Sequence, residues 1–317
     1  MTRLQAPPET TRRRGFTLIE ILVVITILAI LIAFLVPALS GASTRAKIVQ
    51  VRSDIAALES AIAQFKTDFN MEPPSGILIY EDGSDWTTNA TNPAVARSRA
   101  LLRQLWPQYD FAMDRDINRD GYATDTFDLG GSECLVFFLG GVIGFDDLNS
   151  DGNRDTGERA YHAGFSKNPI NPFAADGNRQ GPYFEFRNDR LVESPANPGF
   201  FAYRDPWSNQ TRPYVYVSSY GGKGYRLADL GTGGLQHWYL QGTTATSQAW
   251  LGTKYQIISP GQDGEYGVGG PFVPTQAVAL PGWTRPTPTP STTWTVADRN
   301  YEADNITNFH SGRLSDK

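Results

Sequence analysis

An apolar run near the N-terminus constrains this chain of 317 residues more than any other feature. Residues 16–39 are interrupted by only three polar side chains, Thr17, Glu20 and Thr26. At a rise of about 1.5 Å per residue, such a run forms roughly 36 Å of helix, enough to cross a hydrocarbon core of about 30 Å. The sequence therefore predicts a transmembrane helix over residues 16–39.

Basic residues flank this run unevenly. Before it stand Arg3, Arg12, Arg13 and Arg14, and after it the nearest are Arg45, Lys47 and Arg52. Because an excess of Lys and Arg marks the cytoplasmic side of a span, this bias predicts a single pass with the N-terminus in the cytoplasm and the remainder outside.

An ordinary secretory signal peptide is the alternative reading of the same run. It would be cut at a small-residue site such as Ala38-Leu39-Ser40-Gly41-Ala42. The apolar run is too long for the core of such a signal, and a carboxylate at Glu20 has no use in a segment that is discarded. We therefore favour a retained helix.

The junction before the run carries a more specific signal. The stretch Arg12-Arg13-Arg14-Gly15-Phe16, with Glu20 at the head of the apolar helix, resembles the class III signal of type IV pilins and type II secretion pseudopilins. The resemblance implies that residues 1–15 are a leader, that a prepilin peptidase cuts between Gly15 and Phe16, and that the new N-terminus is methylated.

Glu20 is the one ionisable side chain of the span. A carboxylate there costs about 2.5–3.5 kcal/mol on insertion scales, so it usually has a partner. Cleavage leaves a charged amine on Phe16, and we expect Glu20 to pair with the Phe16 amine of a neighbouring subunit during assembly. A carboxylate merely solvated at headgroup depth is the alternative.

After the span the helix is expected to continue over residues 40–72. Apolar residues recur at steps of three and four, the spacing of one helical face, at Val51, Ile55, Leu58, Ile62, Phe65 and Phe69. Pro73 and Pro74 end the pattern, since a residue before proline is driven out of helical geometry.

Residues 73–173 are expected to form a loop-rich acidic insertion with helices over residues 94–106 and 132–139. One loop has oxygen ligands at alternate positions and a closing acid, the pattern of a calcium loop: Asp147, Asn149, Asp151, Asn153, Asp155 and Glu158. A second loop repeats the first half of that pattern with Asp116, Asn118 and Asp120. Solvated Asp/Asn/Gly turns are the alternative for both loops.

Residues 174–317 read as antiparallel sheet. Candidate strands cover residues 182–187 and 190–193, as a hairpin around Asn188-Asp189, and residues 214–218 and 255–259. The expected fold class is α+β and pilin-like: a long N-terminal helix, half transmembrane and half amphipathic, packed on a C-terminal antiparallel sheet.

Further motifs resemble the G-type major pseudopilin of type II secretion. They are Asp205-Pro206-Trp207-Ser208-Asn209, Ser259-Pro260-Gly261-Gln262-Asp263-Gly264 and Asp304-Asn305-Ile306. The resemblance implies a Ca²⁺ site built from Asp263 and Asp304. This chain departs from the pattern in the long segment between these acids and in Asn305, where a second acid is often found.

Catalysis and nucleic-acid binding are not expected. The net charge is −5, the sequence contains no Gly-x-Ser-x-Gly, His-Glu-x-x-His or P-loop motif, and no basic stripe follows Arg52. The single cysteine, Cys134, lies in an apolar run and is expected to be buried without a disulfide.

The sequence thus indicates a calcium-stabilised pseudopilin-like subunit of a type II secretion filament, held in the bacterial inner membrane with a periplasmic head. Expected partners are prepilin peptidase, other pseudopilins, the inner-membrane assembly platform and membrane lipid. A minor type IV pilin for adhesion or DNA uptake, and a membrane-anchored calcium-dependent binding module that does not polymerise, are the alternatives.

Overall fold

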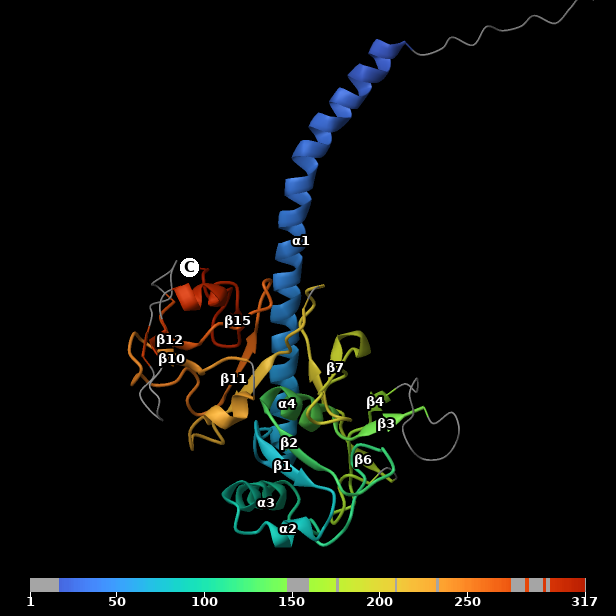
Figure 1. Cartoon of the computed structure of the whole chain (residues 1–317), viewed down its shortest axis with the longest axis vertical. Helices are drawn as coiled ribbons and strands as arrows, with labels where there is room; N and C mark the ends of the chain where they lie inside the picture. Colours follow the sequence, from blue (N-terminus) through green and yellow to red (C-terminus); the bar gives the residue numbers. More distant parts are fainter. Residues whose placement is uncertain are drawn as a thin grey trace, which may run out of the picture. The chain divides into compact units, whose positions relative to one another are not determined.

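The computed structural model describes residues 17–146, 160–174, 177–208, 210–231, 234–274, 283–284, 293–294 and 297–316. It divides into two compact units, Met1–Ala46 and Lys47–Lys317, the second of which we call the head. One long helix, α1 (Leu18–Phe69), contributes to both units (Figure 1).

The other elements all belong to the head. The helices are α2 (Asp85–Thr88), α3 (Pro93–Leu105) and α4 (Gly131–Gly140), with short 3-10 turns η1 (Asn188–Arg190), η2 (Leu227–Leu230) and η3 (Ala297–Glu302). The strands are β1 (Ile77–Tyr80), β2 (Thr126–Leu129), β3 (Ile143–Phe145), β4 (Ala160–His162), β5 (Phe165–Ser166), β6 (Arg179–Gln180), β7 (Leu191–Glu193), β8 (Phe201–Tyr203), β9 (Val215–Ser218), β10 (Tyr239–Gln241), β11 (Tyr255–Ser259), β12 (Gly270–Phe272), β13 (Trp283–Thr284), β14 (Thr293–Trp294) and β15 (Ile306–Thr307).

The head part of α1 packs through the apolar face that the sequence predicted. Its six periodic residues are all buried, from Val51 at 0% exposed to Phe69 at 8%. The polar face is also anchored, because Asp54 accepts a hydrogen bond from Tyr214 and pairs with Arg190 at 2.7 Å. The helix ends at Phe69, three residues before the predicted end at residue 72 and ahead of the two prolines.

Helix α4 lies in the centre of the head core. The ring of Phe138 on α4 packs edge-on against Phe65 of α1, with the ring centroids 5.9 Å apart. Cys134, also on α4, is 0% exposed, so it is buried as expected. At the start of the helix, Glu133 accepts the Gly130 N–H at 2.8 Å, so its carboxylate satisfies the backbone donor of the residue that precedes the first turn. The segment of residues 73–173, predicted to be loop-rich, therefore supplies central elements of the core.

A three-stranded antiparallel sheet, in the order β15-β11-β9, lies beside this core (Figure 1). Strands β9 and β11 coincide with the predicted strands, and the expected α+β class is confirmed. The remaining strands form two-stranded pairs, all antiparallel except β10 and β12, which pair in parallel.

The predicted hairpin over residues 182–193 is wrong. Residues 182–187 form no strand, and β7 pairs instead with β8. The reason is that the N–H groups of Tyr183 and Phe184 donate to the Leu139 carbonyl at the end of α4, so this backbone is used to close a helix. Where a two-residue hairpin turn was expected at Asn188 and Asp189, the chain forms the 3-10 turn η1.

Candidate assembly helix and acidic loops

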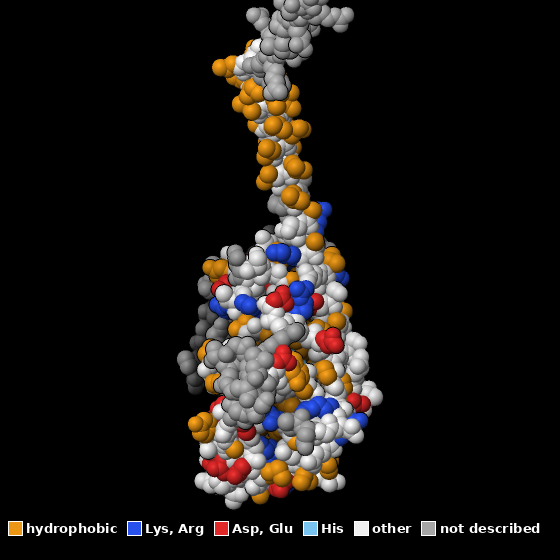
Figure 2. Space-filling model, turned by 90° about the vertical axis from the view of Figure 1, so that its right-hand side faces the viewer, with side chains coloured by type: hydrophobic (Ala, Val, Ile, Leu, Met, Phe, Trp, Pro, Cys, Tyr) orange, Lys and Arg blue, Asp and Glu red, His pale blue; other side chains and the backbone are white. Residues whose placement is uncertain are grey.

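In the first unit, the described part of α1 is an apolar helix whose side chains are exposed. Its described apolar side chains between Leu18 and Val36 are all about half exposed or more, as the orange surface in Figure 2 shows. Among the described residues, α1 alone contains a stretch long and apolar enough to cross a membrane. Burial of this surface needs lipid or other helices, which agrees with the predicted membrane anchor.

Glu20 lies at the start of this helix and closes a capping box with Thr17. The Thr17 backbone N–H and hydroxyl donate to Glu20 Oε2 at 2.7 and 2.8 Å, and the Glu20 N–H donates to the Thr17 hydroxyl at 3.3 Å. Such a box satisfies the first free amides of a helix. The sequence analysis missed this role of Thr17, although the Thr-x-x-Glu spacing was its signal. Gly15 and Phe16 lie outside the described residues.

The first predicted calcium loop also lies outside the described residues. This applies to Asp147, Asn149, Asp151, Asn153, Asp155 and Glu158. The strands on either side, β3 and β4, pair antiparallel, so the two ends of this loop are held together.

The second predicted loop is a compact turn. Asp116 accepts hydrogen bonds from the backbone amides of Arg119, Asp120 and Gly121, and the Asn118 amide group donates to the carboxylates of Asp120 and Asp125 at 3.2 and 3.0 Å. The three predicted ligands are thus brought together, with Asp125 beside them. Their oxygens serve the turn itself, as the alternative of an Asx-type turn describes.

A buried carboxylate that the sequence analysis missed supports this turn from β1. Glu81 follows β1, is 0% exposed, and accepts the N–H groups of Ile117 and Asn118. Burial raises the pKa of Glu81 to about 7, and the nearby charge of Asp116 acts in the same direction. The surroundings of this loop are therefore rich in carboxylates.

The C-terminal acids Asp263 and Asp304 meet, as the resemblance implied. Asp304 Oδ2 accepts the N–H groups of Gln262 and Asp263, at 2.5 and 3.0 Å. A side chain at Gly261 would place its Cβ 2.4 Å from the Asp304 carbonyl oxygen, so only glycine fits this approach. Burial raises the pKa of Asp263 to about 6, and the negative charge of Asp304 contributes to that shift.

Asn305 points into the core and away from this acidic pair. It is 0% exposed, and its amide group donates to the Tyr239 hydroxyl and the Tyr266 carbonyl. An ionised aspartate at this position could not donate these two hydrogen bonds, so the amide of Asn305 suits its buried surroundings.

A buried ion pair lies close to Asn305 in the C-terminal part of the head. Arg299 and Glu302 are joined through two hydrogen bonds of 2.9 and 2.7 Å, and both side chains are 0% exposed. Glu302 also accepts the N–H groups of Val268 and Gly269, while Arg299 donates to the Pro271 carbonyl. The sequence analysis missed this pair, which joins η3 to the segment containing β12.

The Asp-Pro-Trp motif is connected to the C-terminal loop by hydrogen bonds. Asp205 accepts the Ser259 hydroxyl at 2.6 Å and the Gln210 amide at 3.0 Å, and Gln210 also donates to the Gly261 carbonyl. Two of the motifs that carried the resemblance thus form one network.

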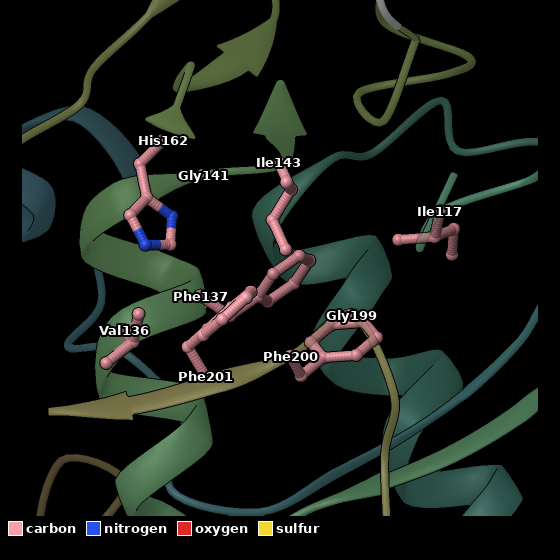
Figure 3. Close-up of a pocket in the computed structure, with 9 residues that line it drawn as sticks. All are labelled: Ile117, Val136, Phe137, Gly141, Ile143, His162, Gly199, Phe200 and Phe201. Carbon is pink, nitrogen blue, oxygen red and sulfur yellow. The ribbon is translucent and has the colours of Figure 1, made fainter. Parts of the chain in front are cut away.

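Within the described ranges, no three His, Cys, Asp or Glu side chains are grouped so that they could hold a metal ion. A small cavity beside His162 is lined mainly by apolar groups, including Val136, Phe137 and Ile143 (Figure 3). Burial lowers the pKa of His162 to about 4, so this histidine is neutral at ordinary pH. The cavity belongs to the packed interior.

Comparison with known proteins adds independent support. Residues 10–36 match the family model "Prokaryotic N-terminal methylation motif". The chain is 48% identical over 62 residues to the type II secretion system core protein G of Pectobacterium carotovorum subsp. carotovorum, covering 20% of this chain and 40% of that protein. It is 41% identical over 98 residues to the protein of the same name from Aeromonas hydrophila, covering 30% of this chain and 65% of that protein. No solved structure matches the chain.

The apolar helix, its N-terminal methylation motif and the α+β head are the features of a membrane-anchored protein similar to the type IV pilin-like class. The relatives, which are type II secretion system core proteins G, confirm the resemblance to the type II secretion pseudopilins that the sequence indicated. The chain matches between two fifths and two thirds of the length of these relatives.

Proposed function

We propose that this chain is a non-enzymatic, pseudopilin-like subunit of a type II secretion filament. The observation that carries the proposal is the methylation motif over residues 10–36, which overlaps α1, together with the exposure of the apolar side chains of α1 from Leu18 to Val36. Such a helix can be stored in a bilayer and transferred into a bundle of identical helices, because both environments cover apolar surface.

The proposed life cycle begins with the N-terminus in the cytoplasm and the head in the periplasm. Prepilin peptidase removes residues 1–15 and methylates Phe16, and the inner-membrane assembly platform then moves the subunit from lipid into a filament with other pseudopilins. Glu20 pairs with the Phe16 amine of a neighbouring subunit. The capping bonds from Thr17 use Oε2 of Glu20, and the pairing uses Oε1.

Replacing Glu20 by glutamine tests this function. Glu20→Gln keeps an oxygen that can complete the capping box but removes the charge that attracts the amine. We expect normal insertion into the inner membrane and a filament yield, in the fraction sheared from cells, that is lower by roughly tenfold, equivalent to about 1.4 kcal/mol of lost pairing.

Thr26→Ala is the matched control, since it removes another polar side chain of the same helix, one that bonds only within its own turn. Its filament yield should equal that of the unmodified chain. Equal yields for Glu20→Gln and Thr26→Ala would contradict the pairing.

We also propose that the head binds Ca²⁺. Carboxylate and carbonyl oxygens are the ligands that this ion prefers. Asp263 and Asp304 offer them at one place, and a cation there would offset the repulsion between the two carboxylates. The loop of residues 147–158 and the turn of Asp116, Asn118 and Asp120 are the other proposed sites, on their sequence pattern.

Calcium should therefore stabilise the folded chain. At free calcium about 100 times the dissociation constant, binding adds about 2.7 kcal/mol, which raises the melting temperature by roughly 5 °C for a domain of this size. The measurement is thermal unfolding of the full-length chain in detergent, with calcium and with chelator.

Three variants assign the effect to its site. We expect Asp263→Asn with Asp304→Asn to lose one part of the shift and Asp151→Asn with Glu158→Gln another, whereas Glu185→Gln, an exposed acid outside both loops, should keep it all. A melting temperature that is identical in calcium and chelator would leave the acidic loops as ordinary turns.

A further inference from the structure

The hairpin of β3 and β4 docks on the head core through a pair of facing side chains. Its two strands pair with each other and with no other strand that the structure describes. Within this pairing Ile143 lies opposite His162, and both side chains line the small cavity beside α4 (Figure 3). Ile143 is 7% exposed, whereas Tyr161, the neighbour of His162 on β4, is 47% exposed. The docked face of the hairpin thus combines one apolar and one ionisable side chain.

The surroundings of the His162 ring suit a neutral imidazole. The ring centroid lies 5.4 Å from that of Phe186 and 6.3 Å from that of Phe201. A Cβ at Gly140 would lie 2.6 Å from His162 Nδ1, so the glycine leaves room for the ring. His162 Nδ1 is buried and has no hydrogen-bond partner. The cavity of about 10 Å³ holds at most one water, and its apolar lining lacks the several polar partners that a buried water needs.

Ionisable side chains stand on the elements around the cavity but do not line it. They are Asp116, Glu133, Cys134, Asp146, Tyr161, Glu185, Arg187, Glu193 and Tyr203. None of them is a cause of the pKa shift of His162: burial lowers this pKa, and the Gly141 backbone, the smaller cause, raises it. Within the described part of the chain, no counter-charge therefore holds a proton on the His162 ring.

We propose that the β3–β4 hairpin is an acid-sensitive flap, which leaves the head when His162 takes up a proton while the rest of the head stays folded. An imidazolium between Phe186 and Phe201 would be a buried charge without a partner, and release returns it to water. Release can be local because the hairpin is hydrogen-bonded to no other described strand. It also frees the two ends of the loop of residues 147–158, which β3 and β4 hold together.

The direction of the effect follows from the two forms of the hairpin. The pKa of His162 is about 4 when the hairpin is docked, and it returns to its ordinary value of about 6.5 when the ring is in water. Between these values the released form binds a proton and the docked form does not. Docking is therefore most stable above pH 6.5 and weakens as the pH falls towards 4, by up to about tenfold in the ratio of the two forms per pH unit.

Amide hydrogen exchange, followed by mass spectrometry on the full-length chain in detergent, measures this release. Each rate is divided by the intrinsic rate at the same pH, and a chelator keeps calcium out of the comparison. We expect residues 141–146 and 160–164 to exchange roughly twentyfold faster at pH 5 than at pH 7. Strands β9 and β11 should keep their protection at both pH values.

Two variants at position 162 remove the proton acceptor. His162→Gln keeps a polar side chain, and His162→Leu suits the apolar lining of the cavity if the glutamine variant docks too loosely to be protected. In both, the corrected exchange of the hairpin should be the same at pH 5 and pH 7. His310→Gln is the matched control, since it removes a histidine outside the cavity, and it should keep the whole acceleration.

Three results would overturn the flap. One is a hairpin in the unmodified chain whose corrected exchange is equal at pH 5 and pH 7, and another is an undiminished acceleration in His162→Leu. The third is an equal acceleration of β9 and β11, which would mean that the head unfolds as a whole. None of these measurements involves filaments or calcium, so the flap and the proposed function are tested separately.

Discussion

The chain that carries Gly15→Leu is expected to accumulate in the membrane with residues 1–15 still attached. A peptidase must bring its catalytic groups against the backbone at the scissile bond, and glycine at that bond leaves the approach open. A leucine side chain obstructs it, so the cleaved fraction should fall by tenfold or more, equivalent to about 1.4 kcal/mol in the barrier. The intact mass and the N-terminal sequence of the purified protein measure the effect.

Gly41→Leu is the matched control for this experiment. A Cβ at Gly41 would meet nothing within 4 Å, so the substitution is accommodated in α1. It also changes the small-residue site at which an ordinary signal peptidase would cut. We expect Gly41→Leu to be processed normally, with a mature N-terminus at Phe16. A mature chain that begins near Ala42, blocked by Gly41→Leu and not by Gly15→Leu, would contradict the pilin-like signal.

Loss of the buried Arg299–Glu302 pair is expected to have the largest effect on stability. Glu302→Ala leaves a guanidinium in the core without its charge partner and removes the acceptor for the N–H groups of Val268 and Gly269. Breaking a buried pair in this way costs about 3–5 kcal/mol of the free energy of unfolding. Urea unfolding of the full-length chain in detergent, followed by tryptophan fluorescence, measures it.

The chain provides its own control in Arg313 and Asp316. This pair has the same sequence spacing, but its side chains are 37% and 39% exposed. Asp316→Ala should therefore cost only about 0–1 kcal/mol. If Glu302→Ala proves too unstable to purify, Glu302→Gln keeps an acceptor oxygen and should still cost far more than Asp316→Ala. Equal losses for the inner and outer pairs would show that burial does not set the strength of the Arg299–Glu302 interaction.

The long helix could be predicted because its signals are local. The apolar run, the periodic face from Val51 to Phe69 and the two prolines each act within a few residues. Strands β9 and β11 were equally clear, since each is a short run of β-branched and aromatic residues. The hairpin around Asn188 failed because a tertiary contact, the Leu139 carbonyl, takes the N–H groups of residues 183 and 184.

Among the features of the candidate sites, those with a local sequence signal could be predicted and those that depend on distant contacts could not. The meeting of Asp263 with Asp304 followed from a family resemblance, and nothing in the local sequence indicates it. Glu81 and the Arg299–Glu302 pair could not be found from the sequence, because their roles depend on burial and on contacts with residues about 30 or more positions away. The capping box of Thr17 and Glu20 was local, and its spacing alone would have predicted it.

The last strand of the sheet has a consequence for the order in which the subunit matures. Strand β15 pairs with β11. The next residue, Asn308, accepts a hydrogen bond from the Ile257 N–H and donates one to the carboxylate of Glu59 on α1, which lies 249 positions earlier in the sequence. The apolar N-terminal part of α1 is thus synthesised first. The contacts between α1 and the C-terminal residues of the chain can form only after nearly the whole chain has been made. A subunit interrupted during synthesis keeps an open edge on β11 and an unpaired Glu59, so it remains open to chaperones and proteases until the final residues arrive.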